Sequence, residues 1–418
     1  MNKLPAGWWE YKFGDLTILS QYGLSCASSS DGETPMLRMN NILDGKLITS
    51  NLVYVSLSPK ALKVFRLNKG DLLFNRTNSY DLIGKTALFD REDDFVCASY
   101  LIRFTLDQSK VIPSFVNYFF NTEKSRTYLR KLATQGVSQS NINPTTLKRR
   151  FVLIIPPLSE QKQIVTILSS WDTAIEQTAK LIAAKVQLKK GLMQQLLTGK
   201  KRFHKFVRDE GKFKTKFGEF PSDWVYLRIK DIAREVLAKN KKGKPLTVLS
   251  CTKYKGLVDS LSYFGKQIFS VDTSTYKIVK RGQFAYATNH IEEGSIGYQD
   301  LYDEALISPM YTVFETDVQV NHSFFYKLLK TETYRHIFEV NTSGSIDRRG
   351  ALRWKDFANI KVALPSLEEQ QRIAAVLEVC EKEIELLVKQ RNALKEQKRG
   401  LMQQLLTGKI RVQTEVEV

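Results

Sequence analysis

Asparagine, glutamine, arginine and histidine gather in four short polar segments of this chain. Segments 75–85 and 135–141 lie in the first half, and segments 288–297 and 341–349 occupy the corresponding part of the second half. Asn, Gln and Arg side chains can form two hydrogen bonds to one base edge, and Ser, Thr and Lys commonly bind phosphate. These residue types therefore indicate contacts with nucleic acid.

We predict that the polar side chains of these segments contact DNA, with Arg76 as the leading candidate for a base contact. They are Arg76, Asn78, Ser79, Tyr80, Lys85, Gln135, Ser138, Gln139, Asn141, Thr288, Asn289, His290, Ser343, Ser345, Arg348 and Arg349. For any single residue the alternative is ordinary turn chemistry, because Asn, Ser and Gly favour turns wherever they occur. The recurrence of both segments in both halves favours a binding role for the loops taken together.

The charge of the chain supports the same partner. It has 63 Lys and Arg against 44 Asp and Glu, a formal net charge of +19 and a pI near 9.5. Such an excess favours a polyanion, because neutralised phosphates release condensed counterions. The alternative is a basic protein whose charge only keeps it in solution. A lipid surface is less favoured, because no basic amphipathic anchor stands apart from the repeat.

Motifs for catalysis and metal binding are missing from the sequence. Segment 83–86, Ile-Gly-Lys-Thr, resembles the end of a phosphate-binding loop, but Ser79 stands where that loop requires glycine. The four histidines have no metal-ligand spacing, the four cysteines form no CxxC pair, and no paired carboxylates mark a nuclease. We therefore expect no metal and no catalytic residue, with any chemistry supplied by a partner. Free thiols and the lack of an apolar signal core predict a cytoplasmic protein.

An exact internal repeat organises the chain. The ten residues 191–200, GLMQQLLTGK, recur unchanged as 400–409, an offset of 209 residues in a chain of 418. The same offset carries segment 156–164 onto 365–373 at several positions. A two-copy repeat of this period indicates a duplicated domain rather than a solenoid. Two similar halves suit a target that itself has two halves.

Each repeat ends in a long predicted helix, 159–198 and 368–407. Apolar residues recur there at alternating steps of four and three, which is typical of a coiled-coil seam. The predicted seam comprises Ile164, Leu168, Trp171, Ile175, Ile182, Leu192, Leu196, Ile373, Leu377, Ile384, Leu387, Leu394, Leu401 and Leu405. We expect the two helices to pair antiparallel, because the second can bury its seam by running back along the first. The alternative is that each helix packs only on its own domain.

The globular parts between the helices have an α+β pattern. Short β-rich runs alternate with Gly, Asn, Asp and Ser clusters, and segments 115–131 and 323–338 read as corresponding helices. The predicted divisions are recognition domain 1–155, spacer helix 156–199, basic linker 200–219, recognition domain 220–364, spacer helix 365–409 and tail 410–418. The simplest alternative for the linker is that it is only a solvated basic turn.

The chain resembles the specificity subunits of Type I restriction–modification systems over essentially its whole length. The resemblance rests on the two strand-to-helix junctions 155–161 and 364–370, on the twin GLMQQLLTGK segments and on the Pro- and Trp-containing starts of both halves. The Ile-Gly elements at 83–84 and 296–297 also fit.

The resemblance implies an α+β fold class: two globular α/β target recognition domains separated by two long helices in an antiparallel coiled coil, with a pseudo-two-fold internal repeat. It implies a non-catalytic subunit whose two domains each read one half of a bipartite, asymmetric DNA site. The coiled coil is expected to set the gap and to dock two modification subunits that methylate adenine with S-adenosylmethionine. Two restriction subunits would then join for ATP- and Mg-dependent translocation and cleavage.

Two alternatives stay open from the sequence. One is the specificity subunit of a related system whose methyltransferase and nuclease partner is fused. The other, from a different class, is a tandem adaptor whose globular parts bind proteins. A stand-alone enzyme is disfavoured because the catalytic motifs are missing.

Overall fold

The computed structural model describes residues 4–27, 32–137, 139–342 and 351–413. The chain divides into two compact units: unit 1 comprises Met1–Ala179 and Lys389–Val418, and unit 2 comprises Lys180–Val388. Each unit thus combines one globular part with segments of both long helices. No helix among the described residues is long and apolar enough to cross a membrane.

Unit 1 is built around a four-stranded antiparallel sheet in the order β2-β11-β7-β9. Its strands are β2 (Thr17–Tyr22), β11 (Leu101–Leu106), β7 (Leu72–Asn75) and β9 (Thr86–Leu88). Strands β7 and β11 are buried almost throughout, so their apolar runs fill both faces of the sheet. Phe13, Phe74, Phe104 and Phe120 meet edge to face with ring centroids 4.9–6.2 Å apart and form the centre of this core.

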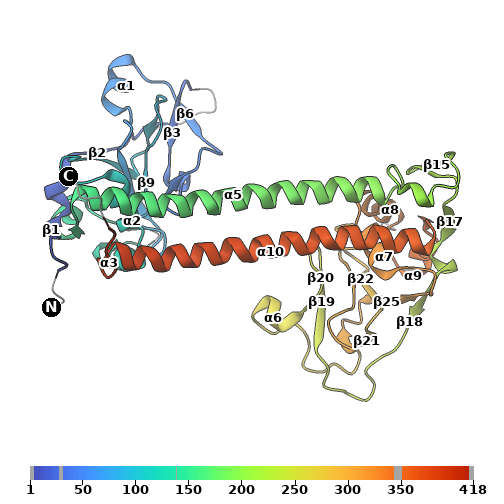
Figure 1. Ribbon diagram of the computed structural model, residues 1–418. Helices are drawn as coiled ribbons and strands as arrows, with labels where there is room; N and C mark the ends of the chain where they lie inside the picture. The colour runs from blue at the N-terminus through green and yellow to red at the C-terminus, as the bar shows by residue number, and fades with distance from the viewer. Residues whose placement is uncertain (1–3, 28–31, 138, 343–350, 414–418) are drawn as a thin grey trace. The chain divides into compact units, whose positions relative to one another are not determined.

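Smaller sheets and helices complete unit 1 (Figure 1). The sheets are β1 (Trp9–Lys12) with β14 (Val152–Ile155), β10 (Val96–Cys97) with β3 (Thr34–Leu37) and β6 (Val53–Val55), β4 (Ile42–Leu43) with β5 (Lys46–Leu47), and β12 (Thr134–Gln135) with β13 (Ser140–Asn141) and β8 (Thr77–Asn78). The helices are α1 (Pro59–Phe65), α2 (Pro113–Phe120), α3 (Glu123–Leu132) and α4 (Pro144–Arg150), with 3-10 turns η1 (Phe13–Leu16) and η2 (Met39–Asn41).

Unit 2 repeats the central sheet with the same strand order. Its strands are β18 (Ala233–Val236), β25 (Tyr311–Thr316), β22 (Phe284–Ala287) and β23 (Ile296–Tyr298), in the order β18-β25-β22-β23. The parallel pair β10–β3 of unit 1 also has a counterpart, in β24 (Glu304–Ile307) and β19 (Val248–Thr252). Both units therefore share the central sheet and this parallel pair, which confirms the predicted duplication and the α+β class.

The other elements of unit 2 surround this sheet (Figure 1). The strands are β20 (Gly256–Asp259) and β21 (Lys277–Lys280), which flank β19 and β24, the pair β17 (Val225–Arg228) and β26 (Lys361–Leu364), and the hairpin β15 (Lys212–Thr215) and β16 (Gly218–Pro221). The helices are α6 (Ser260–Phe264), α7 (His322–Leu329), α8 (Glu332–Asn341) and α9 (Trp354–Phe357), with 3-10 turns η3 (His204–Phe206) and η4 (Ile229–Asp231).

The two helices predicted in the globular parts, 115–131 and 323–338, were each wrong as single helices. The first divides into α2 and α3, and the second into α7 and α8. In both cases a threonine, Thr122 or Thr331, caps the second helix by accepting a hydrogen bond from the backbone N–H three residues later. Side-chain capping at these positions overrides the apolar periodicity that favoured one continuous helix.

The long helices are α5 (Leu158–Leu196) and α10 (Leu367–Leu405). In unit 1 the start of α5, with Ile164 and Leu168, shares a core with Leu405 near the end of α10. In unit 2 the end of α5, with Leu196, shares a core with Ile373 at the start of α10. The helices therefore pair antiparallel, as predicted. Every residue of the predicted seam is buried or partly buried.

Charged residues inside the seam form ion pairs between the helices. Lys398 Nζ lies 2.7 Å from Asp172 Oδ2 in unit 1, where the Tyr118 hydroxyl also donates to Asp172 (2.8 Å). In unit 2, Lys185 and Lys189 bind Glu383 and Glu381 at 2.8 and 2.7 Å. These lysines interrupt the apolar repeat, but their partners on the other helix fix its register.

The segment predicted as a basic linker, 200–219, is not a simple solvated turn. It contains η3, all of β15 and the first part of β16. Arg202 in this segment is largely buried, at 9% side-chain exposure, and its guanidinium binds two carboxylates that the sequence did not reveal as its partners. Basic residues of this segment therefore stabilise the fold through ion pairs, in addition to contributing to the net positive charge of the chain.

Candidate nucleic-acid interface

The two polar loops of unit 1 come together in one small sheet, with the order β12-β13-β8. Asn78 pairs with Ser140 and Thr77 with Asn141, and Gln135 pairs with Ser140 on the other side of β13. The candidate residues Asn78, Gln135 and Asn141 are thereby placed on adjacent strands. Sequence reasoning selected both loops but had no way of pairing them.

Arg76 links this small sheet to the central sheet. Its backbone N–H donates to Tyr100 O (3.0 Å), and its carbonyl accepts from the Ile142 N–H (2.8 Å). The guanidinium carbon lies 4.9 Å from the centroid of the Tyr22 ring, and Nη1 reaches Ser99 O at 3.5 Å. Because a guanidinium has five N–H donors, this one has capacity left for a base edge or a phosphate.

The neighbouring candidates divide between turn-forming and outward-facing side chains. Asn78 Oδ1 accepts from the Ser79 N–H (2.8 Å), which is turn chemistry, whereas Ser79 and Tyr80 are exposed. Lys85 is partly buried, and burial followed by repulsion from Arg126 lowers its pKa. Tyr80 therefore offers an accessible aromatic ring in this loop, whereas Lys85 is less accessible.

The second loop of unit 1 turns at Gly136, whose N–H donates to Gln139 O (2.9 Å). Gln135, Gln139 and Asn141 are exposed, while Ser140 between them is buried. The alternation of the strand therefore directs the amides of Gln139 and Asn141 to solvent, where they are free to contact bases. The candidate Ser138 lies outside the described residues.

The corresponding loop of unit 2 begins at Thr288. The Leu352 N–H donates to Thr288 O (2.9 Å), which repeats the bond from the Ile142 N–H to Arg76 O in unit 1. The Thr288 hydroxyl contacts Asn289 Oδ1 (2.8 Å) and Met310 O (3.1 Å), and the exposed His290 lies 3.4 Å from Glu293. The candidates Ser343, Ser345, Arg348 and Arg349 lie outside the described residues.

The two Ile-Gly elements prove not to be equivalent in position. Ile83-Gly84 lies in the turn before β9, whereas Ile296-Gly297 lies inside β23, opposite Tyr286 and Ala285. By sheet register the counterparts of Ile296 and Gly297 are Thr86 and Ala87, which face Phe74 and Leu73.

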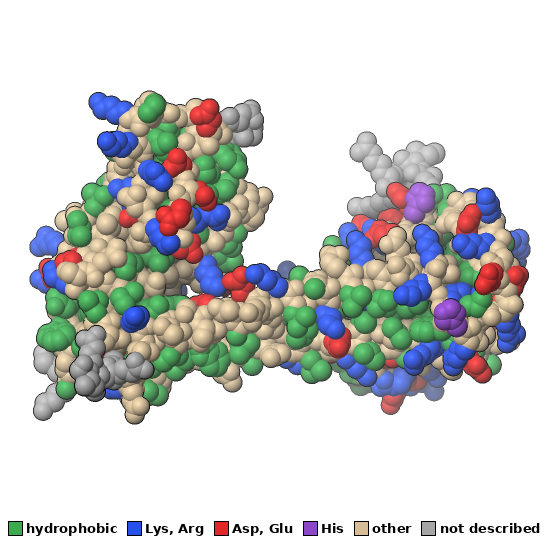
Figure 2. Space-filling view, turned by 45° about the horizontal axis from the view of Figure 1, so that its top comes forward, with side chains coloured by type: hydrophobic (Ala, Val, Ile, Leu, Met, Phe, Trp, Pro, Cys, Tyr) green, Lys and Arg blue, Asp and Glu red, His purple; other side chains and the backbone are tan. Residues whose placement is uncertain are grey.

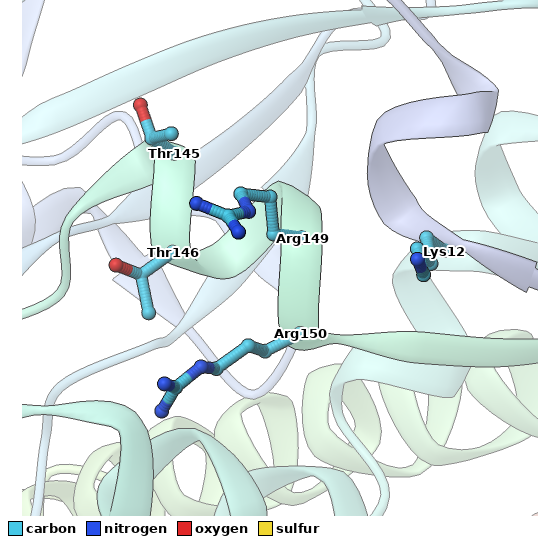
Figure 3. Close-up of a pocket in the computed structure, with 5 residues that line it drawn as sticks. All are labelled: Lys12, Thr145, Thr146, Arg149 and Arg150. Carbon is cyan, nitrogen blue, oxygen red and sulfur yellow. The ribbon is translucent and has the colours of Figure 1, made fainter.

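A hollow of about 260 Å³ is lined largely by basic residues, most of them from the helix that follows the small sheet in the chain. This hollow was not predicted from the sequence. Helix α4 follows β13 directly, and Lys12, Thr145, Thr146, Arg149 and Arg150 line the hollow (Figure 3). Three cations and two hydroxyls suit phosphate oxygens. The run of Lys148, Arg149 and Arg150 is the sequence feature that could have predicted the hollow.

Unit 2 also carries basic side chains on its surface. Figure 2 shows Lys and Arg side chains distributed over the face of unit 2 that it displays.

Each unit also contains a carboxylate–arginine clasp at the start of one long helix. In unit 1, Arg411, which follows α10, binds the buried Glu160 of α5 through Nε and Nη2 at 2.7 and 2.8 Å, and the Trp8 indole donates to the same carboxylate (3.0 Å). In unit 2, Arg202, which follows α5, binds the buried Glu369 of α10 at 2.9 and 2.8 Å. The repeat offset of 209 relates the two arginines and the two glutamates.

The glutamines next to these glutamates repeat the pattern. Gln161 accepts from the Ile112 N–H and donates to the carbonyls of Lys110 and Pro156. Gln370 accepts from the Asn321 N–H and donates to the carbonyls of Gln319 and Pro365. The repeated junction residues therefore hold each helix to its own globular part, and this function explains why they recur while the loops differ.

Chemistry beyond binding has little support in the described part of the chain. There, the single group with metal-ligand donors in reach of one another is His290, Glu292 and Glu293, and its members are largely exposed. Burial raises the pKa of the Cys97 and Cys251 thiols to about 12, so neither is a thiolate nucleophile at neutral pH.

Comparisons with known proteins agree with this architecture. The sequence pattern described as "Type I restriction modification DNA specificity domain" matches residues 5–185 and again 221–396. The chain is 28% identical to a putative type I restriction enzyme MjaX specificity subunit from Methanocaldococcus jannaschii, covering 99% of this chain and 96% of that protein. It is 25% identical to the MjaVIII specificity subunit of the same organism, covering 98% and 94%.

A solved structure shares the fold. The S subunit of a type I restriction–modification system from M. genitalium superposes with a TM-score of 0.54 at 16% identity, covering 97% of each chain. The two matched segments cover most of this chain and fall on its two halves, which share the strand order of the central sheet. The chain therefore belongs to the family of type I restriction–modification DNA specificity subunits, and its task in such a system is DNA recognition rather than catalysis.

Proposed function

We propose that each unit reads one half of a bipartite, asymmetric DNA site through its own polar loops. The observation that carries the proposal is the union of two candidate loops in the β12-β13-β8 sheet of unit 1. The loop of unit 2 begins at the equivalent backbone position, where Thr288 stands in place of Arg76. Equal scaffolds with different reading residues are what an asymmetric site requires.

In unit 1 the reading residues are Arg76, Gln139 and Asn141, with phosphate contacts from the basic hollow. Arg pairs best with guanine and Asn or Gln with adenine in the major groove. Lys12, Arg149 and Arg150 bind the backbone and fix the register of the loops without reading sequence.

The paired helices α5 and α10 set the unread gap and dock two modification subunits. The support is the length of each helix, 39 residues, together with interhelical ion pairs that give the pair one register. The modification subunits would use S-adenosylmethionine to methylate adenine. Two restriction subunits would bring ATP- and Mg-dependent translocation and cleavage, and the whole complex would act in the cytoplasm.

The domain assignment is tested by exchange. Residues 1–155 are replaced with the matching part of another specificity subunit, and methylated adenines are mapped in a host that carries the modification partner. One half-site should change while the other half-site and the gap stay the same. A change in both half-sites, or in neither, would refute the assignment of one reader to each unit.

The base contact is tested by Arg76→Ala. If Arg76 bonds a guanine edge, binding should weaken by about 1–3 kcal/mol and discrimination should relax at one base pair only. If Arg76 binds phosphate, affinity should fall evenly across sequences and the salt slope should drop by about one. Unchanged affinity and slope would remove Arg76 from the interface. The same titration tests the alternative of a tandem protein-binding adaptor. If the chain were such an adaptor, DNA binding by the unaltered chain would not depend steeply on salt concentration.

A further inference from the structure

An exposed aromatic residue marks the turn between β19 and β20 in unit 2. Tyr254 is 83% exposed and stands between Lys253 and Lys255. Lys253 Nζ lies 5.6 Å from the centroid of the Tyr254 ring, and Lys255 Nζ lies 5.3 Å from that of Tyr263 on α6. The hydrophobic core of unit 2 uses neither Tyr254 nor the two lysines, so the fold alone gives no reason for this cluster.

The turn is held in a defined conformation. The Thr252 hydroxyl accepts from the Lys255 N–H and donates to Gly256 O, both at 3.1 Å. Gly256 has a φ of +67°, and a Cβ there would collide with the Tyr326 hydroxyl. The backbone therefore presents Tyr254 at a fixed place instead of leaving it on a loose loop.

Lys330 joins this turn to the candidate reading loop. Its ammonium group donates to Lys253 O and to Gly294 O, both at 2.7 Å. Gly294 ends the loop that begins at Thr288, and the Arg335 guanidinium supports the same loop by donating from Nε to Glu292 O (3.1 Å). The turn and the loop are thus braced by one lysine and lie side by side.

Unit 1 has a different brace at the corresponding place. There Asn121, which precedes the capping Thr122 as Lys330 precedes Thr331, donates to Thr86 Oγ1 at 2.8 Å and not to a hairpin turn. The contact of Lys330 with both the turn and the loop is therefore found in unit 2 and not at the corresponding place of unit 1. Such a difference is expected if the two units recognise different half-sites.

We propose that the Lys253–Lys255 turn is a second DNA-contacting element of the reader in unit 2. Tyr254 enters the groove against a base edge, and Lys253 and Lys255 bind the flanking phosphates. A basic turn with an exposed ring suits DNA, because cations neutralise phosphate and an apolar ring contacts the thymine methyl group. This inference rests on the proposed function of unit 2 and adds to it a segment that none of the predicted loops contains.

The test uses the full chain with its modification partner and two duplexes. One duplex carries the mapped site, and the other carries the same site with the half read by unit 2 scrambled. Dissociation constants are measured at several salt concentrations for Tyr254→Ala, for the double variant Lys253→Ala/Lys255→Ala and for Lys214→Ala. Lys214 is the matched control, because it is a largely exposed lysine on another hairpin of the same unit.

We expect Tyr254→Ala to weaken binding to the intact site by roughly tenfold, within the range of one base contact, and to leave the scrambled duplex unchanged. The double lysine variant should lower the salt slope by about two, and Lys214→Ala should not lower it. Wild-type affinity and slope in both turn variants would overturn the proposal. Equal losses for Tyr254→Ala on both duplexes would overturn the assignment of Tyr254 to a base edge.

These outcomes are distinct from a failure of the proposed function. If the unaltered complex binds the intact and scrambled duplexes equally, unit 2 reads no half-site and the proposed function itself fails. If it discriminates between them while the turn variants behave like wild type, the proposed function stands and only the turn is excluded. Thermal unfolding midpoints of all variants verify that these surface substitutions leave the fold intact.

Discussion

Replacing Arg202 with alanine should destabilise unit 2 much more than the matched replacement of Arg411 destabilises unit 1. Arg202 donates to both oxygens of Glu369, to Asp223 Oδ1 (2.7 Å) and to Phe206 O (2.9 Å). Its side chain is 9% exposed and that of Glu369 is 1% exposed. Its loss leaves a buried carboxylate without a counter-charge, which typically costs about 3–5 kcal/mol.

Arg411 makes the same bidentate contact, but its surroundings are different. Its side chain is 44% exposed, and Glu160 keeps the hydrogen bond from the Trp8 indole after the arginine is removed. The equivalent Trp224 Nε1 is buried and has no hydrogen-bond partner among the described residues. Since water screens the exposed pair and one donor survives, we expect Arg411→Ala to cost about 1–2 kcal/mol.

Urea unfolding, together with hydrogen exchange at the starts of α5 and α10, measures both effects. Exchange should accelerate at the start of α10 in Arg202→Ala and, to a smaller extent, at the start of α5 in Arg411→Ala. Adding Glu369→Gln to Arg202→Ala should recover part of the lost stability, because no buried charge then remains at that position. Equal losses in the two single variants, or no recovery in the double variant, would refute the reasoning from burial.

Three further predictions concern the seam, pH and the basic hollow. Lys398→Glu should destabilise the helix pair of unit 1 by placing two carboxylates together. Adding Asp172→Lys should recover part of the lost melting temperature, but not all of it, because Tyr118 then loses its acceptor and Lys46 its counter-charge; no recovery would exclude a specific pair. Burial lowers the pKa of His322, so its contribution to stability is present above about pH 6.5 and is lost as pH falls towards the lower folded pKa. His322→Gln should flatten the dependence of the unfolding free energy on pH in that window. Arg149→Ala with Arg150→Ala should lower the salt slope of DNA binding by about two without changing the preferred sequence, and an altered sequence would mean that these arginines read bases.

Local sequence signals predicted where helices and strands occur better than they predicted where one helix ends and the next begins. The four-three spacing from Ile164 to Leu196 gave α5 to within two residues at each end. The same reasoning gave one helix over 115–131, where the capping by Thr122 prevailed over periodicity. Interactions within a few residues can be recognised in the sequence one by one, but the sequence does not show which of two competing local signals prevails.

Long-range partners were not predictable in this way. Arg202 looked like one cation of a solvated basic segment, because its partner Glu369 is 167 residues away. The loops around Asn78 and Ser140 were each recognisable as polar turns, yet their pairing depends on how β7 and α4 are placed. Similarly, Tyr254 carried no signal until the structure brought its turn beside Gly294.

Under the proposed function, the separation of scaffold contacts from the proposed reading residues would let two half-sites differ on one architecture. The loops are held at their bases by backbone bonds, from the Ile142 N–H to Arg76 O and from the Leu352 N–H to Thr288 O. Such bonds form whichever side chain stands at the position, so Arg76 and Thr288 can differ without cost to the sheet. The side chains that the fold does require, the glutamate, glutamine and arginine of each helix junction, recur in both halves. Under the proposed function, substitution in the loops would change the DNA sequence that is read, while the helix pairing, and with it the proposed gap, would stay the same.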